Sequence, residues 1–184
     1  MTAIDFFSRW RVRIGYPLAA VALYLARPTP RSILLGAAIG LLGLAIRASS
    51  AGYLHKQEVL TTTGPYAYTR NPLYFGSSIL AIGAAVAIHS VLAAALVLVY
   101  FALVYSFVMR REEVELRGKH GAAFDTFAST VPLFFPRLTP NRQPGAPTAS
   151  FSWAQYKHNH EYEAAAGFLF FLILLAVIWR LRMH

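Results

Sequence analysis

The sequence has no cysteine and little charge. The absence of cysteine excludes disulfides, thiolate metal sites and a cysteine nucleophile. Only 14% of the 184 residues are charged, whereas soluble domains carry about a quarter. Acidic residues are especially scarce, with 8 Asp and Glu against 17 Lys and Arg, while 57% of the chain is hydrophobic. This composition argues against a soluble domain and indicates an integral membrane protein.

The apolar residues fall into five segments, each of which we predict to be a transmembrane helix. They are residues 12–26, 32–54, 73–88, 91–109 and 164–179. At about 1.5 Å of rise per residue, segments of this length nearly cross a hydrocarbon core of about 30 Å. We therefore expect an all-α integral membrane bundle, with residues 1–184 forming a single membrane domain. Residues 110–163, which hold five of the ten prolines, should form a cytosolic cap.

The positive charges predict how the bundle is oriented. If the N-terminus is cytoplasmic, 13 Lys and Arg lie on that side, and only Arg27, Arg31, Arg180 and Arg182 lie on the other. The positive-inside rule then places the long polar segments in the cytosol and the C-terminus on the far side. Because the charges lie in short segments between apolar blocks, they indicate membrane topology and no nucleic-acid partner.

Only His89 and Ser90 separate the third span from the fourth, which predicts a tight antiparallel hairpin. Counting equal distances from this turn brings residues 69–74 beside residues 110–113. Each cluster also has a purely structural explanation. Asn71 and Pro72 suit the start of a helix, and the charges at 110–113 suit the end of a helix in solvent.

Taken together, the two clusters indicate a ligand site. The start of the third span, assisted by Arg70, suits a carboxylate or phosphate. The opposing Glu112 and Glu113 suit a cation, to which Tyr66, Tyr68 and Tyr74 can offer aromatic faces. We therefore expect a ligand that carries charges of both signs.

Two stretches resemble a known family. Residues 63–76, TGPYAYTRNPLYFG, resemble the GPYxxxRHPxYxG signature of isoprenylcysteine carboxyl methyltransferases and related membrane methyltransferases, including phospholipid methyltransferases. Residues 112–136 resemble the family's EExxL…FGxxYxxYxxxVPxxxP stretch, and the resemblance covers about residues 59–138. It implies a membrane methyltransferase that binds S-adenosylmethionine from the cytosol. It also implies a cofactor site lined by Tyr66, Arg70, Asn71, Tyr74, Glu112 and Glu113.

Within that resemblance, Arg70 and Glu113 are the catalytic candidates. Arg70 would orient an acidic acceptor, and Glu113 would hold the cofactor or steer the acceptor. The acceptor is expected to be a lipophilic small molecule or a lipidated molecule that arrives from the bilayer. Carboxyl O-methylation is the first expectation and phospholipid N-methylation the alternative. An NADPH-dependent sterol reductase-like protein and a non-enzymatic membrane scaffold are further alternatives.

Two other features have mainly structural interpretations. Arg47, inside the second span, should either extend to the membrane interface or pair with Glu58. His158 and His160 share a face only in an extended chain, whereas His160 and Glu163 do so only in a helix. No single conformation therefore collects a metal-ligand set, and no metal site is expected.

Overall fold

The computed structural model of the protein describes the backbone of residues 3–55, 59–141 and 150–183, and the side chains of these residues from residue 13 onward. Five long helices make up most of this part: α1 (Ala3–Leu25), α2 (Pro30–Tyr53), α3 (Pro72–Ile88), α4 (Val91–His120) and α7 (Tyr162–Arg182). Three short ones connect them, namely η1 (Gly64–Ala67), α5 (Ala122–Thr130) and α6 (Trp153–His158). The described residues contain no strand, and the expected all-α class is confirmed.

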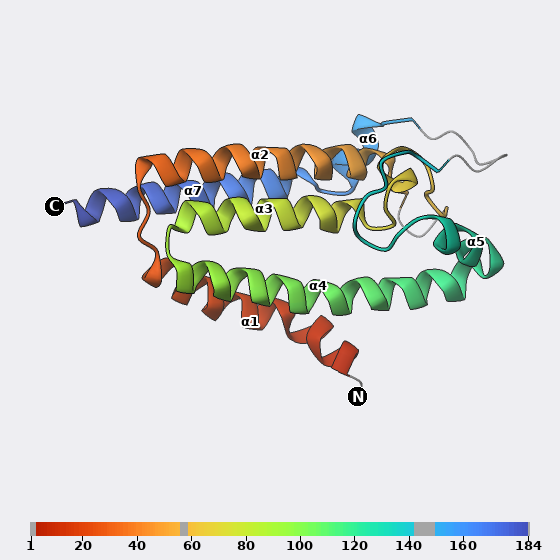
Figure 1. Cartoon of the computed structure of the whole chain (residues 1–184), viewed down its shortest axis with the longest axis horizontal. Coiled ribbons are helices and arrows are strands. Elements are labelled where there is room, and N and C mark those ends of the chain that lie inside the picture. The colour runs from red at the N-terminus through yellow and green to blue at the C-terminus, as the bar shows by residue number, and fades with distance from the viewer. Residues whose placement is uncertain (1–2, 56–58, 142–149, 184) are drawn as a thin grey trace.

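The long helices form two layers (Figure 1). Helices α2, α3 and α7 lie side by side in one layer, and α1 packs along α4 in the other. The connections that carry the two motifs gather at one end of the bundle together with α5 and α6. The C-terminus of α7 and the turn between α3 and α4 lie at the opposite end.

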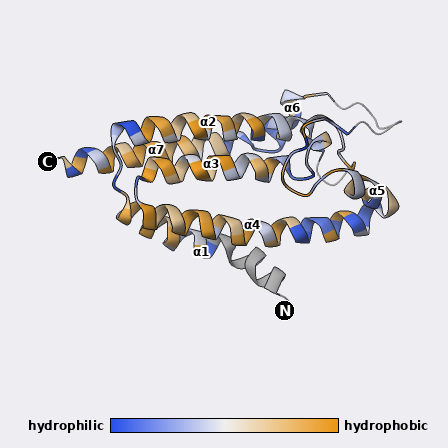
Figure 2. Ribbon diagram, in the orientation of Figure 1, coloured by the Kyte–Doolittle hydropathy of each residue, from blue (hydrophilic) through white to orange (hydrophobic). Residues whose placement is uncertain are grey.

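Three of the helices are long and apolar enough to cross a membrane on their own. These are α2, α4 and α7, whereas the apolar part of α1 (Arg13–Leu25) and α3 are shorter. Figure 2 shows hydrophobic residues along α2, α3, α7 and the first part of α4, with hydrophilic residues in the last part of α4. A helical membrane protein is thus supported. Five crossings, a cytosolic cap and the orientation of the bundle stay predictions.

The hairpin between α3 and α4 forms as predicted. His89 closes α3 in the left-handed conformation, with φ of 53°, and the Ser90 side chain accepts a hydrogen bond from the Ala93 backbone N–H at the start of α4. One residue therefore ends a helix and the next begins another. Helix α4 then continues to His120, so residues 110–113 lie inside a helix and do not close one.

Helices α2 and α3 pack backbone to backbone. A Cβ added to Gly43 would lie 2.6 Å from the Gly76 carbonyl oxygen, and one added to Gly83 would lie 2.7 Å from that of Gly36. No larger side chain fits at these positions. Small residues thus permit the close helix approach that is typical of membrane bundles.

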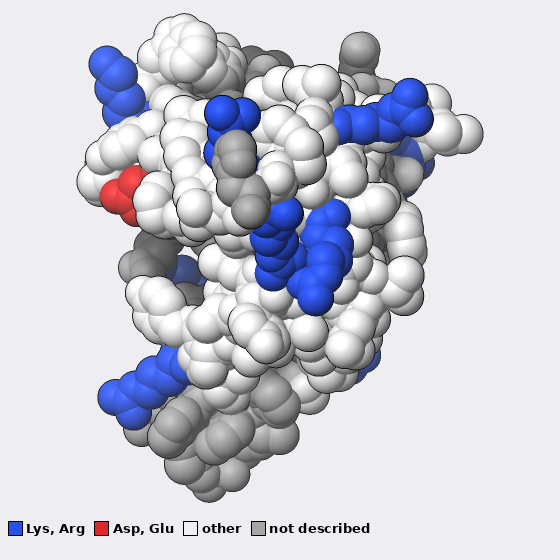
Figure 3. Space-filling view, turned by 90° about the vertical axis from the view of Figure 1, so that its left-hand side faces the viewer, with Lys and Arg blue, Asp and Glu red and all other residues white. Residues whose placement is uncertain are grey.

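At the end of the bundle opposite the two motifs, arginine side chains bind backbone carbonyls at the C-terminal end of α1. Arg182 donates to the backbone carbonyls of Tyr24 and Ala26, and Arg27 also donates to these two carbonyls. Figure 3 views this end and shows two adjoining basic side chains near its middle and single ones near its edges, on a largely uncharged surface.

Candidate functional site

Residues 69–74 and residues 110–113 lie side by side, as the register of the hairpin predicts. Arg70, just before α3, forms an ion pair with Glu113 on α4. One turn further along α3, the Tyr74 hydroxyl donates to Glu112 Oε1 at 2.5 Å. Because both helices rise equally from a two-residue turn, residues at equal distances from the turn lie at the same level.

Backbone hydrogen bonds join the two motifs into one structure. The Arg70 N–H donates to the Pro132 carbonyl, and the Arg137 N–H donates to the Tyr68 carbonyl, both at 2.9 Å. The Asn141 N–H donates to the Ala67 carbonyl, also at 2.9 Å. The proline-containing segment after α5 therefore wraps around the loop that holds Arg70.

Asn71 occupies the N-cap position of α3 without capping it through its side chain. Its Nδ2 donates instead to the Leu133 carbonyl at 2.9 Å, and the neighbouring Thr69 hydroxyl donates to the Phe134 carbonyl at 2.9 Å. The predicted start of the helix, with Asn71 at the N-cap and Pro72 as the first helical residue, is therefore confirmed, but the Asn71 side chain does not bond to the helix. Asn71 holds the wrapping segment in place because its amide can reach across to that segment.

The ion pair of Arg70 and Glu113 is largely enclosed. Their side chains are 14% and 19% exposed, and the Arg70 guanidinium lies 6.0 Å from the centre of the Phe124 ring. Phe124 is buried with Phe127 and Val131 in a small hydrophobic cluster under the segment. The Phe124 ring thus offers an aromatic face to the Arg70 cation.

Several buried polar atoms here lack hydrogen bonds. Among the described residues, four buried side-chain atoms have no hydrogen-bond partner. Two of them are Tyr66 Oη and Arg70 Nε, and a third, Glu113 Oε1, is the atom that forms the ion pair with Arg70. Buried polar groups are normally paired, so unpaired ones need an explanation. All three belong to residues that the resemblance assigns to a cofactor site.

Tyr66 is the most deeply buried member of this group, with 7% of its surface exposed. Burial raises the pKa of its hydroxyl well above the usual range, and the nearby carboxylates of Glu112 and Glu161 raise it further, while Arg47 acts in the opposite direction. The hydroxyl therefore stays protonated at neutral pH and keeps a hydrogen to donate.

Arg47 has a partner that the sequence did not reveal. Its Nε and Nη2 lie 2.5 and 3.0 Å from the two carboxylate oxygens of Glu161, just before α7, and it also donates to the Ser77 hydroxyl of α3. Interface snorkelling is therefore wrong for Arg47. The alternative partner, Glu58, lies outside the described residues. Arg47 and Glu161 are 114 positions apart in the sequence, so their pairing cannot be predicted without knowing that α7 lies beside α2.

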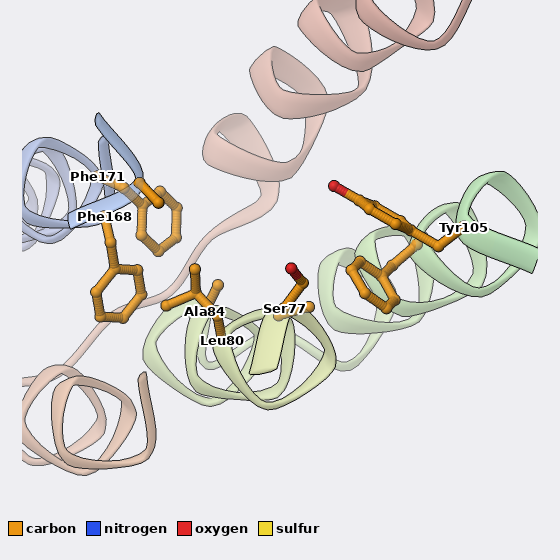
Figure 4. A pocket seen from close by; sticks show the side chains of 9 residues that line it. Ser77, Leu80, Ala84, Tyr105, Phe168 and Phe171 are labelled. Atoms are coloured by element: carbon orange, nitrogen blue, oxygen red, sulfur yellow. The ribbon is translucent and has the colours of Figure 1, made fainter. Parts of the chain in front are cut away.

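Two cavities flank α3. The first, of about 260 Å³, lies between α3, α4 and α7 and is lined mainly by apolar side chains. Figure 4 shows Ser77, Leu80 and Ala84 of α3 in the middle, between Phe168 and Phe171 of α7 on the left and Tyr105 of α4 on the right. The second, of about 500 Å³, lies between α2, the start of α3 and the loop before it, and Tyr68 is one of its lining residues.

The His158 and His160 tract forms no metal-ligand cluster. His160 Nδ1 lies 3.0 Å from the Tyr162 hydroxyl and 3.6 Å from Glu163 Oε1. Throughout the part of the chain that the structure describes, no three His, Asp or Glu residues come together to hold a metal ion.

Comparison with known families identifies the arrangement. The phospholipid methyltransferase family matches residues 32–123, which is half of the chain. The chain belongs to this family. The matched region includes α2, α3 and α4 with the first motif and both glutamates. It ends before the wrapping segment and α7.

Curated relatives of this phospholipid methyltransferase family member bear names from metal resistance. The nickel-cobalt-cadmium resistance protein NccN of Alcaligenes xylosoxydans xylosoxydans is 36% identical over 107 residues, which are 55% of this chain and 50% of the relative. The cobalt-zinc-cadmium resistance protein CzcN of Cupriavidus metallidurans is 30% identical over 141 residues, which are 71% of this chain and 63% of the relative. The chain thus spans half to about two-thirds of their length. No solved structure matches it significantly.

Proposed function

We propose that the protein is an S-adenosylmethionine-dependent membrane methyltransferase that acts on a lipophilic acceptor. The observation that carries the proposal is the enclosed ion pair of Arg70 and Glu113, in which Arg70 Nε has no hydrogen-bond partner. Membership of the phospholipid methyltransferase family supports the same reaction class.

The pair suits the amino acid end of the cofactor. S-adenosylmethionine supplies a methyl group on a positively charged sulfur, and its amino acid end carries an ammonium and a carboxylate. Arg70 can bind the carboxylate and Glu113 the ammonium. Ligand binding would then replace the contact between Arg70 and Glu113 with one contact from each residue to a ligand group of opposite charge. No net charge is left unpaired by this exchange, which keeps its electrostatic cost low.

The neighbourhood also favours a cation. Five charged side chains form what we call the charged cluster: Arg47, Arg70, Glu112, Glu113 and Glu161. The rings of Tyr66 and Tyr74 lie beside it and can face a positive sulfur. In a partly enclosed site, such preorganised charges and positioning are the main contributions that a protein makes to a methyl displacement.

Calorimetric titration of the purified protein with S-adenosylhomocysteine tests cofactor binding. We expect Arg70→Ala and Glu113→Ala each to weaken binding by about tenfold or more, since hydrogen bonds to charged groups contribute about 1.5–3 kcal/mol. Arg111→Ala and Glu115→Ala are matched controls, because these residues form an exposed i,i+4 ion pair on the same helix. Absence of binding by the unaltered protein would refute the proposal.

The acceptor is the less defined part of the proposal. The motif resemblance favours a prenylcysteine carboxylate, and the matching family favours a phospholipid amine. An amine must lose its proton before it attacks, so its methylation should accelerate as pH rises, whereas a carboxylate is ionised throughout the neutral range. Transfer of a labelled methyl group to a prenylcysteine analogue and to phosphatidylethanolamine separates the two.

The names of the relatives suggest a physiological context for the activity. We propose that methylation of a membrane component contributes to tolerance of divalent metal ions. A metal-sensitive bacterial host expressing the protein should grow better on nickel, cobalt or cadmium than the same host expressing Arg70→Ala. Equal growth of the two strains would remove this context and leave the enzymatic proposal standing.

A further inference from the structure

Two arginine side chains converge at the end of the bundle opposite the two motifs. Arg27, just after α1, and Arg182, at the end of α7, both donate to the carbonyl oxygens of Tyr24 and Ala26. A donor nitrogen of each arginine lies within 3.5 Å of the Tyr24 oxygen, so the two nitrogens are no more than twice that distance apart. Two like charges are thus held close together, which is unfavourable unless a negative group balances them.

The end of α1 balances only part of this positive charge. The unpaired carbonyls of a helix C-terminus amount to about half of a negative elementary charge, against one positive charge on each guanidinium. Among the described residues, no ion pair includes Arg27 or Arg182. The Asp and Glu side chains that the structure describes lie in α4, in α5 or at and just before the start of α7, toward the motif end.

Two more arginines add to the charge at this end. Arg31 lies in the first turn of α2 and Arg180 in the last turn of α7, and both are exposed. Arg27, Arg31, Arg180 and Arg182 form what we call the arginine patch. Figure 3 shows the basic side chains of this end on a largely uncharged surface. The patch therefore attracts an anion that the described part of the chain does not supply.

The arginine patch lies at the depth of lipid head groups. Exposed apolar side chains adjoin it on three helices, namely Tyr24 of α1, Leu34 of α2 and Val91 of α4. In a helical membrane protein such side chains face lipid, and the hydrocarbon core ends where the apolar parts of the helices end. Trp179, a residue type that gathers at the membrane interface, directly precedes Arg180. The phosphate groups of one leaflet therefore lie level with the arginines.

We propose that the arginine patch binds the phosphate group of an anionic phospholipid, with Arg27 and Arg182 in direct contact with it. The two carbonyls use only some of the N–H donors of each guanidinium, and the others can pair with phosphate oxygens. A phosphate bound by both side chains would also offset their mutual repulsion. Phosphatidylglycerol fits, whereas the ammonium group of a zwitterionic lipid is repelled by the other arginines.

The lipid site is separate from the proposed methyl-transfer site. Arg70 precedes α3, and the patch lies beyond the other end of that helix. The 17 residues of α3 span about 25 Å at about 1.5 Å of rise per residue. A lipid held by the patch is therefore a ligand and not the methyl acceptor. The inference goes beyond the proposed function, and it does not depend on the orientation of the bundle, because both leaflets present phosphate groups.

Native mass spectrometry of the full chain released from detergent micelles tests the lipid site, because it counts bound lipids directly. The protein is mixed with equal amounts of phosphatidylglycerol and phosphatidylcholine that carry chains of different mass, and the chains are then exchanged between the two lipids. We expect phosphatidylglycerol to bind at least about tenfold more tightly than phosphatidylcholine. Equal binding of the two lipids would overturn the inference.

Matched double variants locate the preference. Arg27→Gln with Arg182→Gln removes both converging charges and keeps amide donors for the α1 carbonyls, so the preference should fall below about threefold. Arg117→Gln with Lys157→Gln removes two charges from exposed positions toward the other end of the bundle and should keep the full preference. Equal loss in both variants would overturn the inference, because any positive charge would then attract the lipid.

Melting temperatures separate a ligand site from a merely structural role of the arginines. Added phosphatidylglycerol should raise the melting temperature of the unaltered protein and of the control variant, but not that of Arg27→Gln with Arg182→Gln. Arg27→Lys with Arg182→Lys keeps both charges and should recover part of the effect. An equal rise in all variants would overturn the site. Displacement of the lipid by inorganic phosphate in millimolar excess would do so as well, since the patch would then bind a soluble anion.

Discussion

Replacing Tyr66 by phenylalanine removes a single oxygen atom from a buried part of the site. That hydroxyl has no hydrogen-bond partner among the described residues, and the side chain is almost fully enclosed. An unsatisfied buried polar group costs about 1–3 kcal/mol. The free protein carries this cost, and a bound ligand that pairs with the hydroxyl would relieve it.

Tyr66→Phe should therefore stabilise the free protein and weaken its ligand binding at the same time. We expect a gain of about 1 kcal/mol in the free energy of unfolding, which for a chain of this size raises the melting temperature by roughly 2–4 °C. Loss of the hydroxyl from the bound state should weaken S-adenosylhomocysteine binding by about threefold to tenfold.

Thermal unfolding of the detergent-solubilised protein, followed by tryptophan fluorescence, measures the first effect, and calorimetric titration with S-adenosylhomocysteine measures the second. Tyr74→Phe provides the contrast, because the Tyr74 hydroxyl donates to Glu112 and its loss should lower the melting temperature. The reasoning is refuted if Tyr66→Phe melts below the unaltered protein, or if it binds S-adenosylhomocysteine equally well.

Three further predictions follow from the packing and the charges. Alkaline pH should destabilise the unaltered protein more than Tyr66→Phe, because burial raises the pKa of Tyr66 in the folded state. Above the ordinary tyrosine pKa of about 10, the unfolded chain releases a proton that the folded chain keeps, and denaturation at pH 8 and pH 11 measures the difference in stability. Gly43→Leu should prevent folding, because its side chain would enter the Gly76 backbone, and size-exclusion chromatography should then show aggregation, unlike Leu42→Ala on an exposed face. Glu161→Leu alone should cost about 3–5 kcal/mol by leaving Arg47 unpaired, and adding Arg47→Met should restore most of it; equal melting temperatures of the single and double variants would contradict this.

The location of Arg70 beside Glu113 could be predicted from the sequence because it depends on one short turn. His89 and Ser90 leave room only for an antiparallel hairpin, and helices of equal rise then pair positions at equal distances from it. The five long helices could be predicted for a similar reason, since apolar segments of sufficient length are read directly from composition. The length of the apolar segment did not predict the end of α4, because this helix continues to His120 after its apolar part ends.

The remainder of the site depends on how distant segments pack. Glu161 meets Arg47 only because α7 lies beside α2, and the Asn71 amide reaches Leu133 only because the second motif folds back over the first. No local pattern encodes these contacts, which join residues more than 60 positions apart.

By itself the sequence determined the helices, the hairpin register and the residues that form the pair of Arg70 and Glu113, since each depends on spacing along one or two adjacent helices. Only the tertiary structure decided which polar groups remain unpaired, where the apolar cavity lies and that the last helix supplies a third carboxylate. The physical reason is that burial and long-range pairing depend on the relative placement of whole helices, which the packing of α2, α3 and α7 fixes.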